Sequence, residues 1–173
     1  LLDDAGLTCP SAHLSFDLGD PGPAFEDAHA IGARYATSSM LHALMADSKP
    51  AGKNEKLAMS LDEAKRTAEF VNRLGEKAKR ADLQYVYHNH AFEFVDQGDG
   101  VTGYDVLLRE TDPDLVQFEI DCGWMVSAGR NPIDYFKAHP GRFPLIHVKD
   151  FLPKTGADAD EKMRGAELGH GVI

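Results

Sequence analysis

The stretch of residues 116–150 constrains the fold of this chain more than any other part of the sequence. Residues 116–120 and 145–148 are apolar, β-branched runs that predict two strands. Between them, Asn131-Pro132 predicts the start of a helix and Pro140-Gly141 its end. Two strands joined by a helix must be parallel, so this stretch is predicted to form a βαβ unit.

Ionisable side chains follow both of these predicted strands. Asp121 comes directly after the first strand, and His147, Lys149 and Asp150 lie at the end of the second. Parallel strands place their carboxyl ends at one edge of the sheet, and the active sites of α/β barrels and open α/β sheets lie at that edge. The sequence therefore indicates an enzyme.

Strands and helices alternate through the rest of the chain as well. Further strands are predicted at residues 8–16, 34–41 and 83–95, further helices at residues 23–32, from Ser60 onward and at residues 102–111, and a polar loop at residues 47–56. Ser60 and Glu63 have the spacing of a capping box, as do Thr102 and Asp105. No hairpin signal separates the strands, so a parallel sheet with helices packed outside it is expected.

Two architectures fit this alternation, a (β/α)₈ barrel and an open doubly wound sheet. We prefer the barrel because polar groups lie at nearly every strand exit and because no glycine-rich phosphate loop follows a strand. A complete TIM barrel takes about 250 residues. The 173 residues of this chain therefore predict a single domain, residues 1–173, that is an incomplete α/β barrel without units at both ends.

The two ends of the sequence support this interpretation. The chain does not begin with methionine, and it stops at Ile173, where a new element is expected to begin, so we interpret it as a piece of a longer chain. A barrel opened at both ends leaves sheet edges unpaired, which predicts instability or association, including a homo-oligomer. The compartment is unknown from the sequence; cytoplasmic is the default, and an export signal would lie upstream of Leu1.

Composition argues against several classes of function. A net charge of −10 disfavours nucleic acid and anionic membranes as partners, because both require a basic surface. No apolar run approaches the roughly 20 residues that span a bilayer. Cys9 and Cys122 are isolated, which favours two small buried residues over a disulfide or a zinc site.

Five candidate site residues come from three consecutive predicted strands: His88, His90, Glu93, Asp121 and His147. In a barrel these residues would converge at one mouth. Imidazole nitrogen and carboxylate oxygen together suit Mn²⁺, Co²⁺, Zn²⁺ or Fe²⁺. Each group also has a purely structural interpretation: Asp121 as a helix or loop cap, His147 as a core histidine bonded to a carbonyl, and the cluster His88-Asn89-His90 as a polar layer in the barrel mouth.

Four segments resemble the sugar phosphate isomerase/epimerase family, whose members are xylose isomerase-like TIM barrels related to inosose dehydratases, ketose 3-epimerases and endonuclease IV. They are residues 87–94 (YHNHAFEF), 120–124 (IDCGW) with Ala128, Gly129 and Pro132, 140–142 (PGR) and 147–150 (HVKD). The similarity covers nearly the whole chain, and residues 121–150 are its most specific part.

The resemblance implies that the present strands are the third to the seventh of the barrel. It implies one divalent metal, held by residues from strands five to eight. Asp121 matches the strand-six ligand, His147 matches the strand-seven ligand, and the strand-eight Glu would lie beyond Ile173. The strand-five ligand stays open among His88, His90 and Glu93. Strict alternation places Glu93 on the face opposite the two histidines, unless the chain has left the strand or a bulge redirects it.

The chemistry implied by the resemblance is proton transfer through an enediolate, with a metal as Lewis acid and carboxylates as acid–base catalysts. We assign Glu93 and Lys149 to catalysis, His88, His90, Trp124 and His13 to substrate binding, and Asp121, His147 and His90 to the metal. Lys149 would neutralise a substrate oxyanion or phosphate. Trp124 and Phe92 are candidate platforms for a sugar, and His42 is a second candidate for lining the pocket.

Four functions compete. The first is a metal-dependent isomerase or epimerase of a free or phosphorylated sugar. The second is a lyase or dehydratase that uses the same enediolate, for example in inosose dehydration or in cleavage of 3-keto-glycosides. The third is DNA repair like that of endonuclease IV, which the acidic charge disfavours. The fourth is a non-catalytic barrel. The expected partner is a small sugar or sugar derivative.

Overall fold

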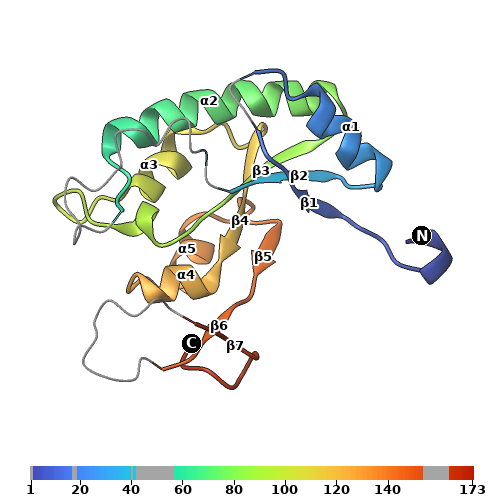
Figure 1. Ribbon diagram of the computed structural model, residues 1–173. Coiled ribbons are helices and arrows are strands. Elements are labelled where there is room, and N and C mark those ends of the chain that lie inside the picture. The colour runs from blue at the N-terminus through green and yellow to red at the C-terminus, as the bar shows by residue number, and fades with distance from the viewer. Residues whose placement is uncertain (1, 17–18, 40, 42–56, 154–163) are drawn as a thin grey trace.

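The computed structural model describes residues 2–16, 19–39, 41, 57–153 and 164–173 of the chain (Figure 1). The elements of these residues are, in chain order, η1 (Asp3–Ala5), β1 (Ser11–His13), α1 (Gly22–Ala30), β2 (Tyr35–Ser38), α2 (Leu61–Arg80), β3 (Gln84–His88), η2 (Phe92–Phe94), α3 (Gly103–Glu110), β4 (Val116–Asp121), α4 (Cys122–Ser127), α5 (Pro132–Ala138), β5 (Leu145–His147), β6 (Asp150–Phe151) and β7 (Gly165–Ala166). His42 and the whole of the predicted loop at residues 47–56 lie outside the described residues.

A five-stranded sheet organises the molecule, with the order β1-β2-β3-β4-β5 and every neighbouring pair parallel. The strands therefore follow one another in space as they do in sequence, which is the arrangement of a barrel wall rather than of a doubly wound sheet. The prediction of an incomplete TIM barrel is confirmed. In the register, His88 is opposite Glu119, and Asp121 is opposite His147, so these side chains meet at one edge of the sheet.

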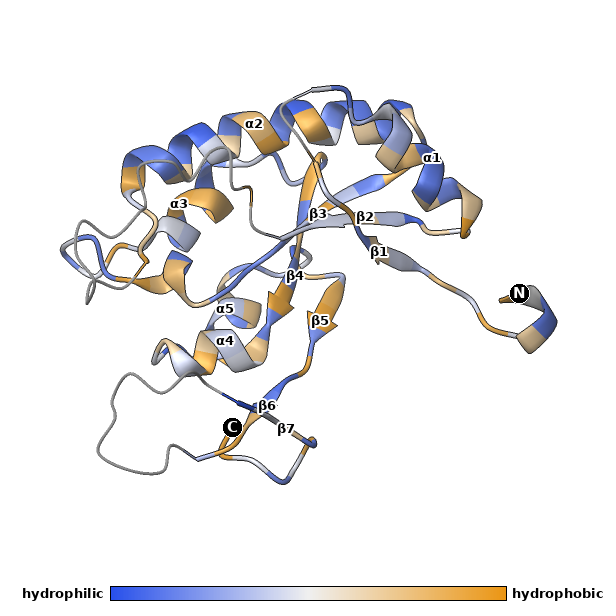
Figure 2. Cartoon of the chain, in the orientation of Figure 1, coloured by the Kyte–Doolittle hydropathy of each residue, from blue (hydrophilic) through white to orange (hydrophobic). Residues whose placement is uncertain are grey.

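Helix α2 is the main cover of this sheet, and it packs against α3 and β3 (Figure 1). Its buried residues are mostly small or apolar, and all of its charged residues except Glu63 are exposed; Figure 2 shows the hydrophobic and hydrophilic residues alternating along the helix. The buried side of α2 is made of small and branched side chains: Ala64, Ala68, Val71, Leu74 and Ala78. Gly75 completes this face because a Cβ at its position would lie 2.5 Å from the carbonyl oxygen of Leu115, so the helix can approach β4 only with glycine there.

The predicted helix starts are confirmed by their hydrogen bonds. The Ser60 side chain accepts from the Glu63 amide at the start of α2, and both halves of the capping box are present. Thr102 and Asp105 form the same reciprocal pair at α3. The Asn131 side chain accepts from the amide of Ile133 at the start of α5.

The predicted strand at residues 83–95 is too long. Strand β3 ends at His88, and the chain then turns into η2. Two contacts oppose an extended chain here: the Glu93 carboxylate accepts a hydrogen bond from the His90 amide at 2.9 Å, and the ring of Phe94 packs at 4.5 Å on that of Tyr104. Both contacts hold this aromatic segment against α3, so it does not continue along the sheet.

Two further features were not predicted. Helix α4 begins immediately after β4, with Asp121 as its N-cap. At the C-terminus, β6 and β7 pair in a small antiparallel sheet, which Figure 1 shows beyond the end of β5. Within the described residues, no helix is both long enough and apolar enough to cross a membrane.

Candidate metal centre

Four histidines and two carboxylates gather where β1, β3, β4 and β5 end. The ring of His88 is at the centre of the group: its centroid lies 4.9 Å from that of His13, 5.2 Å from that of His90 and 5.1 Å from that of His147. Two sets of atoms are close enough to share a metal ion, one from His88, Asp121 and His147 and another from His13, His88 and Glu119. The geometry thus brings together residues that are more than a hundred positions apart in sequence.

The two carboxylate oxygens of Asp121 make different contacts. Oδ1 accepts the amide of Trp124 at 2.9 Å and so caps α4. Oδ2 is buried, and within the described part of the chain no donor reaches it in hydrogen-bond geometry. Nitrogen atoms nevertheless surround it, with Lys149 Nζ at 2.8 Å, His147 Nδ1 at 3.4 Å and His88 Nε2 at 3.7 Å. The capping interpretation is therefore correct for one oxygen, and the other is directed at the cluster.

The backbone of Asp121 is fixed from the neighbouring strand. Asn89 Oδ1 accepts the Asp121 amide at 3.0 Å, and Asn89 Nδ2 donates to the Asp121 carbonyl at 3.3 Å. Asn89 is fully buried, so this pair of bonds is shielded from water. Sequence reasoning treated Asn89 as part of a polar layer, whereas its position shows that it aligns the end of β4 with the end of β3.

Glu119 is the functional candidate that sequence reasoning missed. Its Oε1 lies 2.9 Å from His88 Nδ1 and 2.9 Å from His13 Nε2. Burial alone would raise the pKa of this carboxyl, but the hydrogen bonds from the two histidines outweigh burial and lower it to about 2. The hydrogen bond to Glu119 likewise raises the pKa of His13. Glu119 is therefore an anion that orients two imidazoles.

The orientation of His88 follows from this contact. Because Glu119 is acceptor-only as a carboxylate, Nδ1 of His88 donates to it, and Nε2, 3.7 Å from Asp121 Oδ2, is the nitrogen that a neutral imidazole would offer as a ligand. A histidine whose second nitrogen donates to a carboxylate is the usual arrangement around a metal. The side chain of His88 is 4 % exposed, whereas that of His147 is 40 % exposed and forms the open side of the group.

The other predicted site residues occupy the rim or the interior. His90 lies beside His88, between Trp124 and Phe92, and its atoms are not in either set that could share a metal. Burial lowers the pKa of His90 to about 4, so its ring is neutral at physiological pH. The Lys149 ammonium lies 5.0 Å from the centre of the Trp124 ring as well as beside Asp121. The side chains of His90 and Lys149 therefore border the cluster.

Glu93 lies behind the site rather than in it. Its side chain is fully buried, Oε1 accepts the Tyr87 hydroxyl at 3.0 Å, and Oε2 accepts the His90 amide. Burial raises the pKa of Glu93 to about 8. The chain has indeed left the strand before Glu93, yet the turn directs the carboxyl toward the core, where it holds the backbone of His90 in place.

The comparisons with known proteins agree with this fold. The family model described as xylose isomerase-like TIM barrel matches residues 1–173, and the chain belongs to that family. An inosose dehydratase from Lacticaseibacillus casei is 31% identical over 145 residues, which are 78% of this chain and 44% of that protein. The chain thus spans less than half the length of this curated relative.

Solved structures give the same assignment. A sugar phosphate isomerase/epimerase from Parabacteroides distasonis superposes with a TM-score of 0.66 at 29% identity, over 92% of this chain and 58% of that one. A xylose isomerase-like TIM barrel protein from Mycobacterium smegmatis, in complex with magnesium, gives a TM-score of 0.60 at 17% identity, over 99% of this chain and 61% of that one. At that identity the second match shows a shared fold.

Proposed function

We propose that this protein is part of a divalent-metal-dependent enzyme that moves a proton on a carbon next to a carbonyl group of a sugar, as an isomerase or epimerase. The observation that carries the proposal is the buried Oδ2 of Asp121, which has no hydrogen bond among the described residues but faces three nitrogen atoms. A buried carboxylate oxygen is costly unless positive charge lies beside it, and here the Lys149 ammonium and two imidazole nitrogens converge on Oδ2.

The side chains around Asp121 fit a metal ion. His88 Nε2, His147 and Asp121 Oδ2 would hold it, and this donor set of two imidazoles and one carboxylate suits Mn²⁺, Co²⁺, Zn²⁺ or Fe²⁺. Glu119 would stabilise the complex by fixing the tautomer of His88. In this structure the ammonium of Lys149 lies at the same carboxylate oxygen, which demonstrates that the position attracts positive charge. We retain Asp121 and His147 as ligands and prefer His88 to His90 as the third.

A bound metal would supply Lewis-acid polarisation of the substrate carbonyl and hydroxyl oxygens. Around it, the chain provides groups that bind and protonate. Lys149 Nζ carries a positive charge beside Asp121, within reach of a developing oxyanion. His13 is 46 % exposed and holds a proton against Glu119, so it is a candidate acid on the open side of the cluster. Glu93 is not exposed to a substrate, so we assign it a positioning role for His90 instead of catalysis.

A dehydratase or lyase is the second candidate, and the similarity to an inosose dehydratase favours it specifically. Elimination begins with the same proton abstraction next to a carbonyl and then expels a leaving group from the adjacent carbon. The two reactions are distinguished by their products. In deuterium oxide, an isomerase returns a rearranged or deuterated sugar of unchanged composition, whereas a dehydratase releases water and leaves an unsaturated product, which mass spectrometry distinguishes on ketoses and inososes.

Metal affinity tests the proposal without assuming a substrate. We expect Mn²⁺ or Zn²⁺ to bind the metal-free protein in calorimetric titration and Asp121→Asn to weaken binding by about 100-fold or more, because loss of a ligand should exceed the 10- to 100-fold typical of groups that only orient ligands. Lys149→Gln should strengthen binding, since it removes the competing ammonium.

The matched control is Asp114→Asn, which makes the same charge change on an exposed residue before β4. It should leave metal affinity unchanged. Binding that is absent in the parent protein, or that survives Asp121→Asn, would contradict the proposal. In that case the isomerase and dehydratase hypotheses would be rejected together, because both require the metal at this carboxylate.

A further inference from the structure

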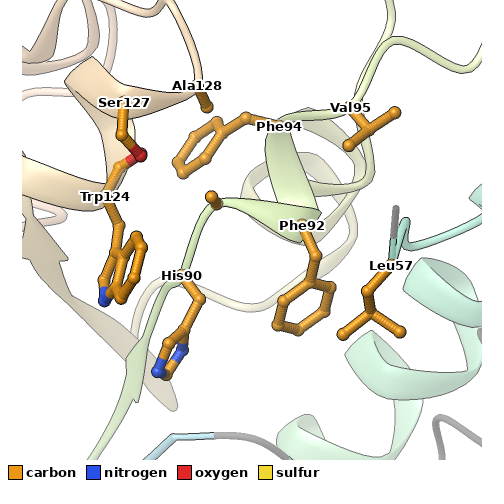
Figure 3. A pocket seen from close by; sticks show the side chains of 9 residues that line it. Leu57, His90, Phe92, Phe94, Val95, Trp124, Ser127 and Ala128 are labelled. Carbon is orange, nitrogen blue, oxygen red and sulfur yellow. The ribbon is translucent and has the colours of Figure 1, made fainter. Parts of the chain in front are cut away.

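A large apolar cavity lies directly beside the metal cluster (Figure 3). It has a volume of about 600 Å³, which is within the range of pockets that bury a small organic molecule. Its walls come from the turn after β3, from α4 and its C-cap, and from the segment that leads into α2: Phe92, Phe94, Val95, Trp124, Ala128 and Leu57.

The cavity offers almost no hydrogen bonds to a ligand. Apart from the indole N–H of Trp124, only two of the residues that line it have polar side chains, His90 and Ser127. The hydroxyl of Ser127 already donates to the carbonyl of Trp124 at 2.7 Å. Nδ1 of His90 is buried and has no hydrogen-bond partner within the described residues. A bare sugar, which carries a hydroxyl on nearly every carbon, would lose hydrogen bonds to water here without replacing them.

The cavity and the metal cluster share a wall. The rings of Trp124 and His90 lie 5.9 Å apart between their centroids, and Figure 3 shows them side by side at one end of the cavity. On its other side this wall meets the cluster, because His90 is 5.2 Å from the ring of His88 and the Trp124 ring is 5.0 Å from Lys149 Nζ. One molecule can therefore contact the cluster with a polar part and the cavity with an apolar part.

We propose that the substrate is a sugar derivative with an apolar substituent, such as an aryl or alkyl aglycone, and that this substituent occupies the cavity while the carbohydrate part lies at the cluster. The inference rests on the proposed function for the placement of the carbohydrate. It specifies the substrate class: a glycoside or similar conjugate rather than a free or phosphorylated sugar. The ring of His90, which lies between the cavity and the cluster, then stands at the junction of the two parts.

Trp124 provides a direct readout of the cavity because it is the only tryptophan in the sequence. We would titrate the metal-free protein with phenyl β-glucoside, octyl β-glucoside and methyl β-glucoside, and follow the fluorescence of Trp124. The sugar part is the same in all three probes. We expect the phenyl and octyl compounds to bind about tenfold or more tightly than the methyl compound, since each buried methylene contributes about fourfold.

Two variants at the end of α4 distinguish an effect on the cavity from a general effect on the helix. Ala128→Phe places a ring in the cavity and should abolish the preference for the apolar glycosides. Val126→Phe enlarges a residue of the same helix that is 37% exposed and does not line the cavity, so it should preserve the preference. Circular dichroism and metal titration of both variants establish that each is folded.

Equal affinities for the three glucosides, or a preference that survives Ala128→Phe, would overturn the inference. A preference for the phenyl compound alone would support it and identify an aromatic substituent. Failure of the proposed function would give a different result, namely unchanged metal affinity in Asp121→Asn. A protein that binds metal at Asp121 but shows no preference among the glucosides would retain the function and lose this substrate class.

Discussion

Two segments carry three of the four histidines of the candidate site and Lys149 beside it, and each segment is held by one carboxyl group. Residues 88–94, which we call the β3 exit, carry His88 and His90, and Glu93 anchors them. Residues 147–151, which we call the β5 exit, carry His147 and Lys149, and Asp150 anchors them. The anchors have the same task, yet their surroundings give them different charge, since Glu93 is mainly a neutral acid near pH 7 and Asp150 is an anion.

Glu93 has few donors around it and much apolar surface. It accepts one backbone amide and the hydroxyl of Tyr87, and it is fully buried. Desolvation is the largest influence on this carboxyl and raises its pKa to about 8, so near pH 7 it is mainly the neutral acid.

Asp150 accepts four backbone amides. They come from Phe151, Gly169, Gly171 and Ile173, at distances between 2.8 and 3.0 Å. These bonds, led by that from Ile173, lower the pKa of Asp150, so it is a carboxylate. Gly171 is required here because a Cβ at its position would collide with the carboxylate. The contrast teaches that the number of amides directed at a carboxyl group, and not its depth alone, decides whether it is charged.

Truncation of Glu93 tests this contrast with the largest expected effect. Glu93→Ala leaves a cavity and removes the acceptor of the His90 amide and the Tyr87 hydroxyl, and should lower the free energy of unfolding by about 2–4 kcal/mol. Glu93→Gln keeps the shape and the neutral charge, and should cost less than about 1 kcal/mol at neutral pH. Denaturant unfolding measures both values. If the two variants lose equal stability, Glu93 acts as an anion and the contrast fails.

The corresponding change at Asp150 should behave differently. Asp150→Asn places an amide NH₂ where the carboxylate now accepts two backbone N–H groups at each oxygen. Donors would then face donors, so the C-terminal residues should detach from the β5 exit. We expect the amides of Gly169 and Gly171 to exchange with solvent about tenfold faster or more, measured by hydrogen exchange. Unchanged protection in Asp150→Asn would mean that β6 and β7 hold this region without the charge.

Local sequence patterns predicted the parts of the fold that depend on near neighbours. The pairs Ser60 with Glu63 and Thr102 with Asp105 are three residues apart, so their spacing alone identifies the helix starts. The candidate ligand Asp121 was likewise found from its place at a strand end. These features need no knowledge of what packs against them, and for that reason the alternation of elements and the incomplete barrel followed from the sequence.

Features that depend on distant contacts could not be predicted in the same way. Glu119 meets His13 across 106 positions, and within its strand it is one polar residue between Phe118 and Ile120. A signal was present, because residues two apart on a strand share a face and Glu119 precedes Asp121 by two. The turn after His88 depends on the packing of Phe94 against α3, which strand propensity does not include.

The dependence of stability on pH is the smallest predicted effect per measured step, and it isolates the charge of Glu93. Its pKa is about 8 in the folded chain against a usual 4.5, so between these values the folded state binds more protons than the unfolded state. Stability from this group must therefore be greatest below about pH 4.5 and fall as pH rises toward 8, by at most about 1.4 kcal/mol per pH unit. Asp150 has the opposite sign, because its lowered pKa gives stability that is present above pH 3.8 and lost in acid.

Other groups titrate in the same range, so the measurement is the difference between the parent protein and Glu93→Gln in denaturant unfolding at pH 5, 6, 7 and 8. The parent should lose stability relative to the variant at each step. A parallel pair of curves would show that Glu93 is ionised throughout, and the two exits would then be held by the same kind of anchor.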